Sequence, residues 1–287
     1  MEFIVATLTP VTPQNEVNPE CFKDMLEFFR QRGVTGILPS GTTGEFASLP
    51  LSQRRRLFEL AGREKKNLWF LAGAGCTNLS ETQDLISFAA DCGADAALVI
   101  PPFYFRDASP AGLTGYFERL LESSRLPIAY YHIPQNSGIT AVRQILAPLA
   151  SHERLLGVKD SSGDKEGLKA LIADLPGKKI WVGTEAFLVD ALGAGAFGGV
   201  SALGNAFPHL IRETLDLIRA GKDPSSAQGQ AETARTIVNR YGTIPALRFL
   251  LAKLWGIDPG PPLLPLAAIS EEQGKSLLEE LRKARVI

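Results

Sequence analysis

The sequence has few of the residues that mark metal centres, disulfide frameworks or nucleic-acid interfaces. Its 287 residues include only three cysteines and three histidines, and these are scattered without the close spacing of a zinc site or a disulfide scaffold. The formal net charge is −1, and the densest basic cluster, Arg54–Arg56, lies in a helical pattern that predicts a solvated helix face. We therefore expect no metal centre and no nucleic-acid partner.

Long apolar runs are also missing. No run reaches the length that spans a membrane, and the first residues, MEFIVATLTP, lack the charged leader and the length of a signal peptide. Scattered cysteines without a pairing pattern are typical of a reducing compartment. The expectation is a cytoplasmic protein without a membrane segment.

Short apolar, β-branched runs recur at regular intervals with helical patterns between them. The predicted strands cover residues 3–8, 36–39, 68–72, 96–100, 127–133, 155–159, 179–183 and 199–203. Nearly continuous apolar strands that alternate with helices indicate a parallel sheet buried on both faces. Eight such units predict a (β/α)8 barrel. An open, doubly wound sheet is the alternative, but it favours a glycine-rich loop after the first strand, where this chain has TPVTP.

The pattern changes after residue 207. From there to residue 287 it is helical only, without a low-complexity linker. We therefore predict a barrel over residues 1–207, followed by the last barrel helix and a helical extension over residues 208–287, with no second independent domain.

A single lysine, Lys159, interrupts the apolar sixth strand, LLGVKD. Burial disfavours the charge of a lysine. A neutral amine among apolar neighbours is a nucleophile, and its natural target is a carbonyl carbon. Lys159 is therefore a candidate for Schiff-base formation, although a lysine that ends a strand with its ammonium group in solvent fits the same segment.

Other candidate residues follow the strands on the same side of the barrel, where the active sites of such barrels lie. The turn SGTTGE at residues 40–45 offers backbone N–H groups and hydroxyls that suit a small carboxylate. Side chains alternate along a strand, so Tyr131 and Ile133 share one face of the fifth strand, while Tyr130 and His132 share the other. Tyr131 is a candidate proton shuttle, and His132 is predicted to pack under the helices.

The last strands contribute small residues rather than charges. Ser161, two residues after the lysine, can face the same cavity, and Gly183 admits a ligand at close range. No lysine or arginine lies between Lys179 and Arg212, so a phosphorylated substrate is not expected.

Four features occur in order along the chain: GTTGE, a tyrosine at Tyr104, YxIP and GVKD. In these features the chain resembles the pyruvate-dependent class I aldolases, over essentially its whole length. That superfamily includes dihydrodipicolinate synthase, N-acetylneuraminate lyase and the aldolases of 2-keto-3-deoxygluconate and 4-hydroxy-2-oxoglutarate.

The resemblance implies roles for particular residues. Lys159 matches the Schiff-base lysine and Tyr131 the general acid/base of the family. Thr42 and Tyr104 match a hydroxyl relay in which the tyrosine comes from a neighbouring subunit. Thr43 matches the threonine that binds the pyruvate carboxylate, and Gly183 and Val200 match positions near the imine. The resemblance also implies a homotetramer of two dimers and no metal or organic cofactor.

Two departures bear on the substrate. Dihydrodipicolinate synthases carry an arginine two positions after the strand-five proline, which grips the carboxylate of aspartate semialdehyde, whereas this chain has Asn136. Ser161 resembles the lyases that act on hydroxylated substrates. The sequence therefore predicts a lyase that cleaves a 4-hydroxy-2-oxo acid to pyruvate and an aldehyde. A synthase that condenses pyruvate with aspartate semialdehyde, a dehydratase and a non-catalytic pyruvate-binding protein are the alternatives.

Overall fold

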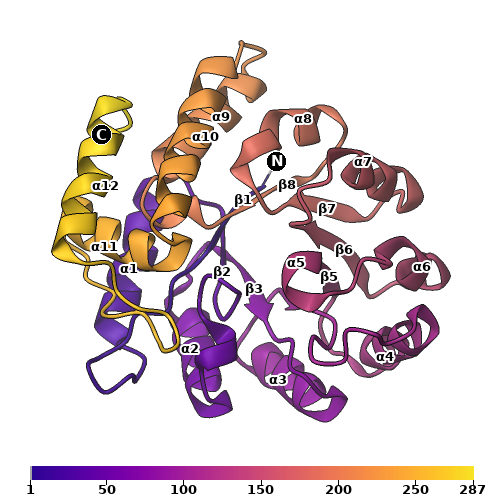
Figure 1. Ribbon diagram of the computed structural model, residues 1–287. Helices are drawn as coiled ribbons and strands as arrows, with labels where there is room; N and C mark the ends of the chain where they lie inside the picture. Colours follow the sequence, from indigo (N-terminus) through magenta and orange to yellow (C-terminus); the bar gives the residue numbers. More distant parts are fainter. Residues whose placement is uncertain (1) are drawn as a thin grey trace.

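The computed structural model describes residues 2–287 and contains a closed barrel of eight parallel strands (Figure 1). Each strand pairs with the next in chain order, and the last closes on the first. The strands are β1 (Glu2–Ala6), β2 (Gly36–Leu38), β3 (Trp69–Gly73), β4 (Ala96–Val99), β5 (Ile128–His132), β6 (Leu155–Asp160), β7 (Lys179–Val182) and β8 (Gly198–Ser201). The predicted (β/α)8 barrel is confirmed.

Helices surround the barrel (Figure 1). They are α1 (Pro19–Gln31), α2 (Leu51–Glu64), α3 (Leu79–Asp91), α4 (Pro110–Ser123), α5 (Pro134–Ser137), α6 (Val142–Leu146), α7 (Lys165–Asp174), α8 (Leu188–Gly193), α9 (Pro208–Arg219), α10 (Ser225–Arg240), α11 (Thr243–Trp255) and α12 (Glu271–Lys283). The continuous helix expected over residues 140–150 is instead α6 followed by a 3-10 turn at Ala147–Leu149. Pro148 has no N–H group to continue the α-helical bonding pattern.

Two apolar cores meet at the strands. Side chains such as Ile4, Leu71 and Trp181 fill the barrel interior, and a larger cluster packs between the strands and the helices. Tyr131 belongs to the inner cluster and Tyr130 to the outer one. The alternation predicted for β5 is therefore confirmed, and the same alternation places Tyr131 in the barrel.

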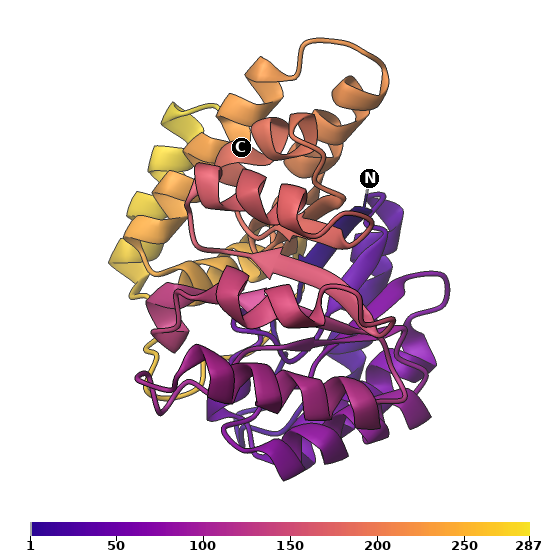
Figure 2. The same ribbon diagram turned by 90° about the vertical axis from the view of Figure 1, so that its right-hand side faces the viewer.

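The C-terminal helices α10, α11 and α12 gather on one side of the barrel in both views (Figures 1 and 2). Arg248 on α11 forms a buried ion pair with Glu45, and the two side chains are 3% and 2% exposed. Arg248 also donates to the carbonyl oxygen of Thr9 at 2.7 Å, and Glu45 accepts from the backbone N–H of Leu263 at 2.6 Å. The extension is thus bonded directly to the loops after β1 and β2. Over residues 2–287, no helix combines the length and apolar character that crossing a membrane requires.

Replacing Arg248 by methionine should strongly destabilise the fold. Glu45 would remain buried without its counter-charge, and breaking a buried pair in this way costs about 3–5 kcal/mol. Urea unfolding followed by circular dichroism measures the change. The matched control is Arg143→Ala, which breaks the largely exposed pair between Arg143 and Asp174 and should leave the unfolding midpoint unchanged. Equal effects of the two substitutions would contradict the assigned role of the buried pair.

Candidate active site

Lys159 and Tyr131 lie side by side inside the barrel. They are register partners on the adjacent strands β6 and β5, and their exposed fractions are only 4% and 5%. The Lys159 Nζ atom lies 4.2 Å from the centroid of the Tyr131 ring. The lysine is therefore held against the Tyr131 ring inside the barrel.

The backbone of β6 makes this pairing possible at Gly157, two residues before the lysine. Its φ angle is 155°, and a Cβ atom there would lie 1.7 Å from the carbonyl oxygen of Lys179 on β7. The pairing of β5 with β6 also shifts by one position between Ile128 and Ala129. Only glycine permits this close approach of the strands, so the sequence of β6 fixes the position of Lys159.

The loop after β2 brings a hydroxyl to Tyr131. Thr42 Oγ1 donates to the Tyr131 hydroxyl oxygen over a long distance of 3.4 Å, and Thr43 beside it is buried. A small cavity lies between this loop and the barrel interior, lined in part by Thr42, Phe46, Ile100 and Tyr131. The structure thus brings Thr42 and Tyr131 together at this end of the barrel, with Thr43 next to Thr42 in the chain.

The environment of Tyr131 favours its ionised form. Burial alone raises the pKa of a tyrosine, but the charge of Lys159 and the hydrogen bonds with Thr42, Ser161 and Lys159 outweigh it. The pKa of Tyr131 therefore lies below its ordinary value. A tyrosine of this kind is suited to accept a proton from a nearby group at moderate pH.

Small residues at the ends of β6, β7 and β8 complete the site. Ser161 lies so close to Gly183 that a Cβ atom at residue 183 would approach the Ser161 hydroxyl oxygen to 1.9 Å. Val200 on β8 is 2% exposed and belongs to the inner cluster that contains Tyr131. Glycine at residue 183 therefore leaves the room that the serine hydroxyl occupies.

Two predicted site residues lie apart from this group. Asn136 is exposed on the short helix α5, which the sequence pattern did not reveal. Tyr104 is 78% exposed after β4, and its ring contacts Phe105. Within the part of the chain that the structure describes, no interaction connects Tyr104 with Tyr131. The relay that the resemblance implies therefore requires a tyrosine from another chain.

Arg54 was wrongly predicted to lie on a solvated face. It is 3% exposed and donates to the Ser40 hydroxyl oxygen at 2.8 Å and to the carbonyl oxygens of Gly73 and Gly75 at 2.8 and 3.0 Å. These bonds hold the start of the loop that carries Thr42. A signal was present, because Arg54 shares a helix face with the buried Leu57, Phe58 and Ala61.

Arg235 on α10 is a further positively charged side chain near the site. It was not predicted from the sequence, because it lies on a helix rather than among the residues that follow the strands. Arg235, Glu185 and Asn239 line a cavity of about 180 Å³ beside Gly183. The Arg235 Nε atom lies 3.7 Å from the buried Glu185 carboxylate, so its charge is already compensated. Across residues 2–287, no group of three or more His, Cys, Asp or Glu side chains is arranged to hold a metal ion.

Known proteins resemble this chain over nearly its whole length. The dihydrodipicolinate synthetase family matches residues 1–284. An uncharacterized DapA-like lyase of Chloroflexus aurantiacus is 37% identical over 281 residues, which cover 96% of this chain and 93% of that protein. The 4-hydroxy-tetrahydrodipicolinate synthase of Methanosarcina barkeri is 29% identical, with 98% and 97% covered. The chloride-inhibited dihydrodipicolinate synthase of Acinetobacter baumannii, solved with pyruvate, superimposes with a TM-score of 0.91 at 26% identity and covers 100% of this chain and 99% of that one.

Fold and comparisons together define an enzyme class, the lyases and synthases that act through a Schiff base on a (β/α)8 barrel. The chain belongs to the dihydrodipicolinate synthetase family. The resemblance inferred from the sequence motifs is confirmed at this level.

Removing the charge of Lys159 should raise the pKa of Tyr131 from its wild-type position. In Lys159→Met the burial of Tyr131 remains while the attraction of the cation is lost, so ionisation of the ring should require a higher pH than in the wild type. Tyrosinate absorbance during an alkaline titration measures this, with the Tyr131→Phe protein subtracted to isolate one ring. An unchanged titration of Tyr131 in Lys159→Met would show that the lysine does not control its ionisation.

Proposed function

We propose that this enzyme is a pyruvate lyase that cleaves a 4-hydroxy-2-oxo acid, either 4-hydroxy-2-oxoglutarate or a 2-keto-3-deoxy sugar acid, to pyruvate and an aldehyde. The observation that carries the proposal is the buried contact between Lys159 and Tyr131, with Nζ 4.2 Å from the ring centroid. A nucleophile and a proton acceptor in contact at a strand end are what Schiff-base cleavage requires. The reaction needs no metal or organic cofactor.

The first half of the mechanism makes the imine. Tyr131 in its ionised form, which its lowered pKa favours, accepts a proton from Lys159, and the neutral amine attacks C2 of the substrate. Tyr131 then returns that proton to the C2 hydroxyl, which leaves as water, and the protonated imine that remains is the electron sink. Thr43, with backbone help from Thr42, binds the adjacent carboxylate in the turn after β2.

The second half breaks the carbon–carbon bond. The Tyr131 oxygen takes the proton of the C4 hydroxyl, the C3–C4 bond breaks, and the aldehyde departs. The electrons of the broken C3–C4 bond form a C2–C3 double bond, so the imine becomes an enamine. A proton returned to C3 and the addition of water then release pyruvate and regenerate Lys159.

The polar groups near Gly183 support a hydroxylated aldehyde portion. Ser161 lies against Gly183, and the cavity beside Gly183 offers Glu185, Arg235 and Asn239. Asn136, in place of the synthase arginine, removes the bidentate grip on a second carboxylate at that position. These features favour cleavage of a hydroxylated acid over condensation with aspartate semialdehyde.

Condensation of pyruvate with aspartate semialdehyde is the second candidate. It is favoured by the printed name of the Methanosarcina barkeri relative, a 4-hydroxy-tetrahydrodipicolinate synthase. Both reactions begin with the same lysine and the same enamine, so the Lys159–Tyr131 contact is equally compatible with each. Their difference lies in the aldehyde partner and in the direction of the reaction.

The lyase should release pyruvate from one member of a panel of 4-hydroxy-2-oxoglutarate, 2-keto-3-deoxygluconate and N-acetylneuraminate. A lactate dehydrogenase couple detects the product. Lys159→Ala should abolish release because no imine forms, and Tyr131→Phe should slow it by about 10²- to 10⁴-fold, the usual contribution of a general acid/base. If none of the three substrates releases pyruvate and the enzyme instead consumes pyruvate with aspartate semialdehyde, the lyase proposal is rejected in favour of the synthase.

We also infer that Tyr104 acts in a neighbouring subunit of a homotetramer built from two dimers. The support is the 78% exposure of Tyr104 and the 66% exposure of Phe105, whose ring packs against it. A cytoplasmic location fits the three free cysteines.

Co-expression of two inactive chains tests this arrangement. Lys159→Ala keeps Tyr104, and Tyr104→Phe keeps Lys159, so a mixed dimer contains one complete site. Activity should therefore return when the two chains assemble together, whereas each variant alone should be weak or inactive. The control is Tyr241→Phe co-expressed with Lys159→Ala, where Tyr241 lies far along the chain and bonds Glu280. Failure to recover activity in purified mixed oligomers would show that Tyr104 does not serve the neighbouring site.

A further inference from the structure

Two titratable side chains lie directly behind Tyr131 and Lys159, on the helix-facing side of the same strands. His132 and Asp160 are register partners on β5 and β6, one residue beyond the inner pair. They are 7% and 1% exposed. Within residues 2–287, neither His132 Nδ1 nor Asp160 Oδ2 has a hydrogen-bond partner. Buried polar atoms are almost always bonded, so two of them at paired positions call for an explanation.

Hydrogen bonds connect this outer pair to the site. The backbone N–H of Ser161 donates to the carbonyl oxygen of His132 at 2.8 Å, which extends the pairing of the two strands past Lys159. The backbone N–H of Ser162 donates to Asp160 Oδ1 at 2.9 Å. The Asp160 carboxylate therefore holds the turn that carries Ser161, and any shift of that turn moves Ser161 relative to Lys159.

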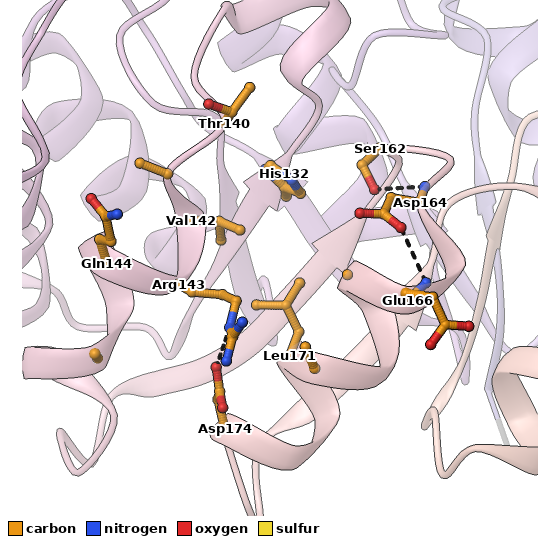
Figure 3. Close-up of a pocket in the computed structure, with 14 residues that line it drawn as sticks. His132, Thr140, Val142, Arg143, Gln144, Ser162, Asp164, Glu166, Leu171 and Asp174 are labelled. Carbon is orange, nitrogen blue, oxygen red and sulfur yellow. Dashed lines mark hydrogen bonds and ion pairs between the residues drawn. The ribbon is translucent and has the colours of Figure 1, made fainter.

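A groove between α6 and α7 gives solvent access to His132. Its volume is about 830 Å³, and His132 lies at its back (Figure 3). Four charged side chains also line the groove: Arg143, Asp164, Glu166 and Asp174. Arg143 pairs with Asp174, and Asp164 caps α7 by accepting from the N–H of Glu166. Protons can thus reach His132 from a side of the barrel that is separate from the substrate-binding side.

The surroundings move the two ionisations towards each other. Burial lowers the pKa of His132 below 6.5, and the carboxylates of Asp160 and Asp164 oppose the change. Burial raises the pKa of Asp160 above 3.8, while its bonds with Ser162 and the nearness of His132 oppose it. Tyr130 is the other helix-facing polar side chain on β5, and burial raises its pKa. Its hydroxyl therefore keeps its proton throughout the pH range in which His132 and Asp160 change charge. Burial therefore favours the uncharged form of each of the two side chains, His132 and Asp160.

We propose that His132 and Asp160 are positioning residues, two adjacent titratable side chains that fix the ends of β5 and β6 and thereby set the placement of Ser161 and Lys159. With Asp160 ionised and His132 neutral, the carboxylate accepts strongly from the Ser162 N–H and the strand ends are held. Protonation of the pair weakens that bond and places a charge on His132 in a buried position. The lysine is then less well placed, and imine formation slows.

The test is the rate of imine formation with pyruvate, trapped by borohydride and counted by mass spectrometry, from neutral pH down through the interval between 6.5 and 3.8. The inference rests on the proposed Schiff-base function, so wild-type protein is run first. Wild type that traps no pyruvate would overturn both proposals. Wild type that does trap it establishes the imine and leaves the positioning role to the variants.

Asp160→Ala removes the acceptor of the Ser162 N–H and should slow imine formation about tenfold to about a hundredfold, as expected when reacting groups are misplaced. Asp160→Asn keeps an acceptor and should recover most of the rate at neutral pH while losing the wild-type pH dependence in the acid range. His132→Asn should likewise flatten that dependence. Recovery by asparagine distinguishes positioning from a general loss of stability.

The matched control is Asp174→Asn, which alters a carboxylate of the same groove that is paired with Arg143 and should leave the rate and its pH dependence unchanged. Circular dichroism at each pH ensures that folded protein is compared. Should Asp160→Ala fail to fold, Asp160→Asn and His132→Asn still decide the matter. Wild-type pH profiles in both of those variants would overturn the inference.

Discussion

The buried ion pair between Glu45 and Arg248 is the interaction on which the site most depends. Glu45 adopts a left-handed backbone conformation, with a φ angle of 57°, at the end of the turn that carries Thr42 and Thr43. Its carboxylate can be buried there only because Arg248 and the N–H of Leu263 neutralise and bond it. Arg248 in turn bonds the carbonyl oxygens of Thr9 and Pro259. The C-terminal extension is therefore part of the scaffold that shapes the turn, and the barrel alone would leave a charge unpaired beside the site.

A second constraint acts on the opposite side of the barrel interior. Gly157 lets β6 approach β7, and the register that follows pairs Lys159 with Tyr131. Once the lysine is held there, the tyrosine is the group that can stabilise its charge, and the lysine lowers the pKa of the tyrosine in return. The lowered pKa of Tyr131 is thus a consequence of its burial beside Lys159. Burial without the lysine would act in the opposite direction.

Local patterns were enough to predict the fold and the inner face of β5. The run of apolar strands gave the barrel, and alternation placed Tyr131 inside and His132 under the helices. The same reasoning could not find Glu45–Arg248, because its partners are 203 residues apart and each alone resembles a solvated surface residue. It misplaced Arg54 because charge was weighed above the helix face it shares with Leu57. Helix α5 was missed because four residues are too few for a periodic pattern.

The residues proposed to form the imine and those proposed to face the aldehyde lie on different kinds of segment. Lys159 and Tyr131 stand on strands, where pairing on both sides fixes them to within small displacements. Residues proposed to face the aldehyde come from turns and from the extension, such as Ser161 and Arg235. Substitutions in those segments can change the partner of the enamine without disturbing the strands that form it. A chain 29% identical to a named synthase can therefore keep the strands that hold Lys159 and Tyr131 while it differs in the turns around them, as the proposed cleavage of a hydroxylated acid requires.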